Sequence, residues 1–69
     1  MERVKIVSSN ISEAGFDPAS RTLELMFVNG RVYQYFDVPQ HVFDGLCNAP
    51  SAGQYFNQEI RGIYRFARA

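Results

Sequence analysis

Apolar and polar residues alternate in two segments near the middle of the chain, residues 22–28 and 31–36. Both segments are rich in β-branched and aromatic side chains, and they flank the dipeptide Asn29-Gly30. Asn-Gly favours the positive backbone angles of a two-residue hairpin turn. The pattern therefore predicts two antiparallel strands joined by a tight turn.

The turn also fixes which residues of the two strands lie opposite each other. With Asn29 and Gly30 as the turn, Leu25 faces Gln34. Alternation then predicts a core face that carries Leu23, Leu25, Phe27, Val32, Gln34 and Phe36. The opposite face carries Glu24, Met26, Val28, Arg31, Tyr33 and Tyr35, so we expect the two tyrosines to point away from Leu23 and Leu25. A shift of one residue would exchange the two faces.

The residues before the hairpin predict further strands. Residues 10–16 form a plausible third strand, and Asp17-Pro18-Ala19-Ser20 is typical of a turn that leads back into the hairpin. Residues 4–7 are a short extended segment that could form an edge strand. The first half of the chain is therefore expected to be a three- or four-stranded antiparallel β-meander.

After the hairpin the apolar spacing becomes helical. Asp37-Val38-Pro39 is typical of a helix start, and an apolar stripe follows at Val42, Phe43, Leu46 and Cys47. Ser51 and Gln54 have the spacing of a capping box, which predicts a second helix over residues 52–61. Residues 63–69 are left unassigned. The fold class is α+β, in which two short helices pack on one face of the meander.

Size and composition limit how this fold is stabilised. The chain has 69 residues, enough for one domain over residues 1–69, and 46% of them are hydrophobic. Cys47 is the only cysteine and His41 the only histidine, so neither a disulfide nor a Cys/His metal cluster is available. Cys47 lies on the apolar stripe and is expected to be buried. No apolar run is long enough for a signal peptide or a membrane span, so we expect a cytoplasmic protein.

The formal net charge is zero, but charge is unevenly distributed along the chain. Residues 61–69 contain Arg61, Arg65 and Arg68 and no acidic residue. These arginines could contact phosphates, or they could be a solvated helix end where cations suit the helix dipole. A neutral domain is a weaker candidate for nucleic-acid binding than a basic one.

Several short motifs occur in an order that resembles the KTSC domain. This family is named for the C-terminus of some lysyl-tRNA synthetases and is also found as a lone bacterial domain. The matching residues run from position 8 to about 64: Ser8-Ser9 with Ile11, Gly15-Phe16-Asp17, Thr22-Leu23-Glu24 leading to Phe27, Asn29-Gly30, Tyr33-Gln34-Tyr35, Val38-Pro39, Leu46, Ala49, Ser51, Gly53 with Tyr55-Phe56-Asn57, and Ile60-Arg61. The resemblance implies a β-rich first half, a helical second half and, as a suggestion for the family, RNA binding.

Tyr33 and Tyr35 are the candidate recognition residues. On one sheet face beside Arg31 they could form a platform on which unpaired bases stack. The alternative is that they pack within the domain with their hydroxyls at the rim, which a short chain with a small core favours. The candidate nucleic-acid-binding residues are Arg31, Tyr33, Tyr35, Arg61, Arg65 and Arg68.

Nothing in the sequence predicts catalysis. His41 has no nucleophile at a usable spacing, and Ser8 and Ser9 lack the context of a nucleophile elbow. We therefore expect no catalytic residue, no metal and no cofactor. The leading hypothesis is a non-catalytic module that binds single-stranded RNA. The competing one is a protein-interaction module that uses an exposed aromatic face or an edge strand.

Overall fold

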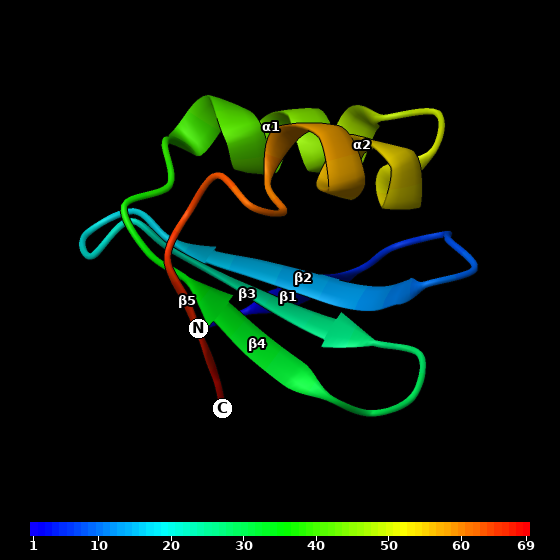
Figure 1. Ribbon diagram of the computed structural model, residues 1–69, viewed down its shortest axis with the longest axis horizontal. Coiled ribbons are helices and arrows are strands. Elements are labelled where there is room, and N and C mark those ends of the chain that lie inside the picture. The colour runs from blue at the N-terminus through cyan, green and yellow to red at the C-terminus, as the bar shows by residue number, and fades with distance from the viewer.

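The computed structural model describes residues 1–69 and has two layers, a five-stranded antiparallel sheet and two helices that cover one of its faces (Figure 1). The strands lie side by side in the order β1-β2-β3-β4-β5. The elements are β1 (Arg3–Lys5), β2 (Ile11–Asp17), β3 (Thr22–Phe27), β4 (Val32–Tyr35), α1 (Gln40–Asn48), α2 (Ala52–Glu59) and β5 (Phe66–Arg68). The predicted α+β fold, a meander followed by two helices on one sheet face, is confirmed.

The sheet has five strands, whereas the sequence predicted three or four. The predicted second helix, residues 52–61, ends at Glu59. The unassigned residues 63–69 contain β5, which returns across the end of the helical layer and pairs with β4. Because β5 joins the sheet only after both helices, the edge beside β4 is formed by the end of the chain.

The register of the β3–β4 hairpin differs from the predicted one by one residue. Leu25 lies opposite Tyr33, and Leu23 lies opposite Tyr35. The backbone N–H of Phe27 donates to the carbonyl of Arg31 over 2.9 Å, so the loop contains three residues, 28–30, instead of two. Gly30 has φ +88° at the third loop position, the usual site of a left-handed residue in three-residue hairpin loops.

This shift exchanges the faces of β4, so the predicted placement of Tyr33 and Tyr35 on the face away from the leucines is wrong. Both tyrosines lie on the helix-covered face with Leu23 and Leu25, and Tyr35 is only 5% exposed. Gln34, which we expected in the core, lies on the open face and donates to Glu24 over 3.0 Å. The predicted inward orientation of the leucines is confirmed, since both are fully buried.

A bulge in β2 adjusts this strand to the core. Ile11 pairs with Phe27 and Glu13 pairs with Met26, so Ser12 is the extra residue. An extra residue reverses the alternation beyond it. Ile11 and Ala14 are three positions apart, yet both are fully buried against the helices.

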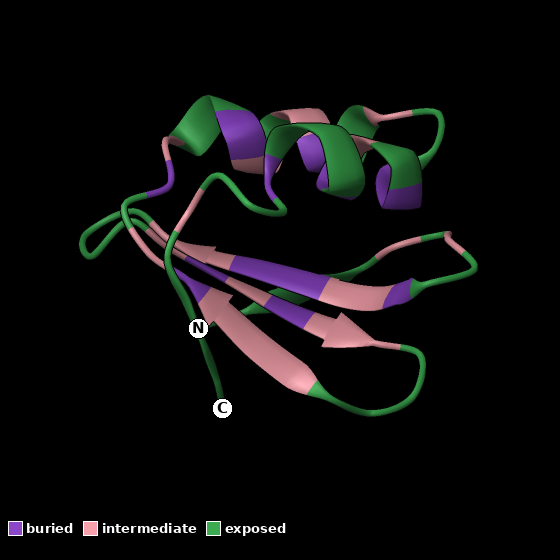
Figure 2. Ribbon diagram, viewed as in Figure 1, coloured by how far each residue is buried: buried purple, intermediate pink, exposed green.

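The two helices close the core from above (Figure 2). Val42 and Leu46 are buried on α1, and Phe56 is buried on α2. The predicted cap of the second helix is present, because the Ser51 hydroxyl accepts a hydrogen bond from the backbone N–H of Gln54 over 3.3 Å. Neither helix is both long and apolar enough to span a bilayer.

The predicted apolar stripe of the first helix is wrong at Cys47. Its side chain is exposed, whereas we expected it to be buried. The buried positions of α1 are Val42 and Leu46, four residues apart on one side of the helix, and Cys47 lies one position beyond them. Partial desolvation still raises the pKa of the Cys47 thiol, and the negative charge of Asp44 adds to this shift.

The face of the sheet away from the helices carries a polar network. Arg3 forms ion pairs with Glu13 at 3.4 Å and with Glu24 at 3.1 Å. Gly15 makes room for this arginine, because a Cβ atom there would lie 2.9 Å from the Arg3 side chain and 2.6 Å from the carbonyl of Glu2. These pairs neutralise the positive charge of Arg3 within the domain.

Ile60 and Ile63 offer a matched test of this packing, because Ile60 is fully buried and Ile63 is 60% exposed. We expect Ile60→Val to lower the free energy of unfolding by about 0.5–1.5 kcal/mol, because it deletes a buried methyl group. Ile63→Val should change it by less than about 0.5 kcal/mol. Urea unfolding of the two variants measures the difference, and equal losses would contradict the described core.

Candidate binding site

A hollow of about 380 Å³ opens between the end of α2, the sheet and β5. Five aromatic or apolar side chains line it, with two arginines among its polar residues. We call it the arginine-rimmed hollow; its lining residues are Phe27, Asn29, Arg31, Tyr33, Tyr35, Phe56, Arg61, Gly62 and Phe66. No lining residue is acidic, so the polar part of the site is cationic or neutral.

Edge-on and tilted aromatic rings form the wall of the hollow. The ring of Phe56 meets Phe27 at 5.5 Å and Tyr35 at 5.7 Å between centroids, both edge to face. The ring of Phe66 lies 5.8 Å from Tyr33 and 5.6 Å from Tyr35. These distances are typical of favourable aromatic pairs. The tyrosines are therefore held within the domain instead of forming a free platform.

Phe66 is the aromatic residue that remains available to a ligand. Its side chain is 59% exposed, although it packs on both tyrosines. The sequence pattern did not indicate Phe66 as a binding residue, because it lies within residues 63–69, for which no secondary structure was predicted. Its pairing with Tyr35 across β4 and β5 places it on the helix-covered face of the sheet.

Three of the four candidate arginines lie on separate segments of the chain but on the same side of the sheet. Arg31 follows the hairpin loop and Arg61 follows α2, and both line the hollow. Arg68 pairs with Tyr33 across β4 and β5, which puts it on the same face of the sheet. All three are exposed, and none forms an ion pair within the domain. Their positive charge is free to meet an anion.

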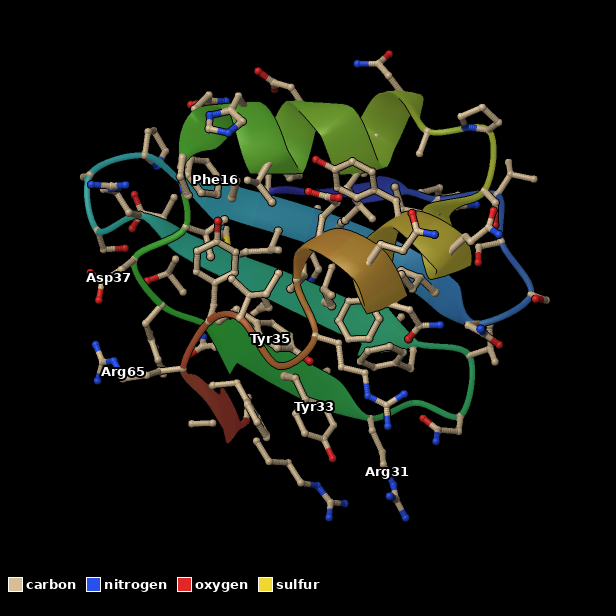
Figure 3. The ribbon with its side chains drawn as sticks, turned by 45° about the horizontal axis from the view of Figure 1, so that its top comes forward. Phe16, Arg31, Tyr33, Tyr35, Asp37 and Arg65 are labelled. Atoms are coloured by element: carbon tan, nitrogen blue, oxygen red, sulfur yellow. The ribbon has the colours of Figure 1, made fainter.

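Arg65 lies apart from the other nominated residues (Figure 3). Its guanidinium forms an ion pair with Asp37 at 3.0 Å and lies 5.7 Å from the centre of the Phe36 ring. The backbone carbonyl of Arg65 also accepts from Phe36 over 2.9 Å. The contacts of Arg65 hold the chain against the end of β4, and its nominated role in nucleic-acid binding stays a prediction.

The Tyr35 side chain is almost fully buried in the wall of the hollow. Desolvation raises the pKa of Tyr35, Tyr33 adds to the rise, and the positive charge of Arg61 opposes it. A neutral hydroxyl can both donate and accept a hydrogen bond. The site thus combines aromatic surface, hydroxyl groups and free guanidiniums, a set suited to a flat ligand that carries negative charge.

The other polar residues considered in the sequence do not form a second such site. No three His, Cys, Asp or Glu side chains gather as metal ligands. The Ser8 hydroxyl accepts from the backbone N–H groups of Asn10, at 3.1 Å, and Ile11, at 3.4 Å. The Ser8 hydroxyl therefore bonds to neighbouring backbone. His41 is exposed on α1.

The two-layer fold and this site define a small single-domain α+β module. Comparison with known protein families shows which family it belongs to. The model of the KTSC domain matches residues 7–64, so the chain belongs to the KTSC domain family. A crystal structure of a KTSC domain protein from Yersinia pestis superimposes with a TM-score of 0.95 at 32% sequence identity. That match covers 99% of this chain and 96% of the Yersinia chain.

Relatives carry this domain both alone and within larger proteins. An uncharacterized protein from Stutzerimonas stutzeri is 41% identical over 69 residues, which cover 99% of this chain and 97% of that protein. A lysine–tRNA ligase from Nostoc punctiforme is 41% identical over 63 residues, which are 91% of this chain. The chain spans only 11% of the length of that ligase.

Burial of Tyr35 predicts a dependence of stability on alkaline pH. Its folded-state pKa is raised above the ordinary value of 10.0, so the folded state binds the proton more tightly than the unfolded state. This contribution is fully present below the unfolded pKa and is lost as pH rises through the raised folded pKa. We expect the urea midpoint to fall above about pH 10, and to fall less in Tyr35→Phe. An identical fall in both proteins would show that Tyr35 is not the group involved.

Proposed function

We propose that this KTSC domain is a small non-catalytic module that binds single-stranded RNA in the arginine-rimmed hollow. The observation that carries the proposal is the gathering of Arg31, Arg61 and Arg68 around exposed Phe66, without an acidic residue among them. An unpaired base stacks on Phe66, and its phosphates bind the guanidiniums. The domain works in the cytoplasm, where an exposed free cysteine is kept reduced.

The chemistry of the hollow supports RNA binding because it offers an aromatic ring for the base of a nucleotide and guanidinium groups for its phosphate. Stacking of a base on an aromatic side chain is worth about 1–3 kcal/mol. A guanidinium presents several donors in a planar fork and binds phosphate in a bidentate way. Unpaired bases are the form in which RNA offers flat ring faces to a protein.

The relatives support the same conclusion. Lysine–tRNA ligases, by their name, act on a tRNA, and the ligase from Nostoc punctiforme contains a segment 41% identical to this chain. An RNA-binding module within such an enzyme would add contacts to its nucleic-acid substrate. The zero net charge of the present chain limits it to a few phosphate contacts and hence to modest affinity.

A titration of the labelled domain with mixed-sequence RNA oligomers at low salt tests the proposal. We expect amide shifts at Arg31, Tyr33 and Phe66, which fade as salt is added. Phe66→Ala should weaken binding by about 5- to 100-fold, the equivalent of one lost stack. Ile63→Ala is the matched control, because Ile63 is 60% exposed and lies outside the hollow.

The proposal fails if saturating RNA leaves the amides of the hollow unchanged. It also fails if Phe66→Ala and Ile63→Ala weaken binding equally, because binding would then be insensitive to the ring that the proposal requires.

A protein-interaction module is the second candidate, and one observation favours it. Ile63 and Phe66 are both largely exposed and line a second hollow beside the first. Exposed apolar neighbours of this kind occur at protein contacts. This function predicts self-association or partner binding that is insensitive to salt and is reduced by Ile63→Ala. Sedimentation at increasing protein concentration measures the first of these; a monomer at all concentrations contradicts self-association.

A further inference from the structure

We infer that the arginine-rimmed hollow holds a single unpaired ribonucleotide with its adjoining phosphates, and that the rest of an RNA strand makes no specific contact with the domain. This inference rests on the proposed function and specifies the unit of RNA that the site recognises. It distinguishes the domain from modules that bind a strand along an extended groove.

The size of the hollow is the first reason. Its volume of about 380 Å³ is near the lower end of the range for small-molecule sites, about 300–1,000 Å³. Phe56 on α2 and Phe66 on β5 both line it. A hollow of this size, bounded by a helix on one side and an edge strand on the other, fits one nucleotide better than a run of stacked bases.

The neighbouring surface is the second reason. Beyond Phe66 lies the second hollow, which is lined by Phe36, Ile63, Tyr64 and Arg65 and shares Gly62 and Phe66 with the first. Its arginine is already paired with Asp37 at 3.0 Å. A phosphate that entered this neighbouring hollow would be repelled by the Asp37 carboxylate. The electrostatic potential that favours a phosphate therefore does not extend beyond Phe66.

The placement of the remaining cations is the third reason. Arg3 is neutralised by two glutamates on the open face, and Lys5 lies on β1, the opposite edge of the sheet from β5. Arg21 lies in the turn between β2 and β3. Modules that bind a strand along its length line a groove with cations. Here Arg31, Arg61 and Arg68 form one cluster of unpaired cations, whereas Lys5 and Arg21 lie singly on β1 and in the β2–β3 turn, away from it.

A length series distinguishes one nucleotide from a strand. The probes are the nucleoside 3′,5′-bisphosphates of the four RNA bases and 5′-phosphorylated ribo-oligonucleotides from the dinucleotide to the octanucleotide. We expect a bisphosphate of the preferred base to shift the same amides as the octanucleotide, with a Kd within about tenfold of it. The salt slope should stay at about −1.4 for every length, the value for contacts to the two phosphates that adjoin one nucleotide.

Arginine variants test whether the salt slope of binding comes from the cluster of Arg31, Arg61 and Arg68. Arg31→Gln and Arg68→Gln should each reduce its magnitude by about 0.7, the contribution of one phosphate contact to a single strand. Arg21→Gln is the matched control, since it removes an equal charge from an exposed turn outside the hollow. A slope that Arg21→Gln changes as much as Arg31→Gln would overturn the inference, because binding would then depend on total charge.

The outcomes separate the two proposals. Affinity and salt slope that grow with each added nucleotide up to the octamer would overturn the single-nucleotide inference and leave RNA binding intact. An octanucleotide that does not bind at all would overturn both. Binding of the bisphosphate with a constant slope along the series supports both.

Discussion

The three-residue loop between β3 and β4 is the constraint on which the rest of the structure depends. The hydrogen bond from Phe27 to Arg31 and the left-handed backbone of Gly30 together set the register of the two central strands. This register directs Tyr33 and Tyr35 toward the helices. A two-residue turn would direct both rings to the open face, where no helix would cover them.

Aromatic packing then provides what a small core lacks. The chain has no disulfide, and a domain of this size has little apolar surface to bury. Phe56 and Phe66 close around the two tyrosines from α2 and β5, so residues far apart in the sequence form one cluster of rings. The same cluster forms the wall of the arginine-rimmed hollow. The candidate site therefore lies at the margin of the hydrophobic core and is lined by side chains that also stabilise the fold.

The end of the chain joins stability to the proposed function. β5 is held to β4 by backbone pairing, by the Asp37–Arg65 ion pair and by the rings beneath Phe66. The ion pair is exposed and contributes at most about 1 kcal/mol. Its clearer effect is on the distribution of charge, because it neutralises Arg65 and leaves the free guanidiniums on the other side of Phe66. A domain with zero net charge thereby acquires one local positive site.

Local sequence patterns determined most of the elements, because the signals for them lie within a few neighbouring residues. Alternation predicted the strands before the helices, the helical spacing and the serine cap predicted both helices, and the motifs from Ser8 to Arg61 indicated the family. Of the predicted site residues, Arg31, Tyr33, Tyr35 and Arg61 line one hollow, and Arg68 lies opposite Tyr33 on the same face of the sheet. Arg65 is instead paired with Asp37.

Only the tertiary structure decided the face on which those residues lie. Asn-Gly is compatible with a loop of two or three residues, and one residue of difference exchanges the two sides of a strand. Phe66 and β5 could not be predicted, because a three-residue strand has no periodicity of its own and exists by pairing with β4. The sequence alone determined the elements from β1 to α2, whereas long-range pairing determined β5, which rings face the helices and which remain open to a ligand.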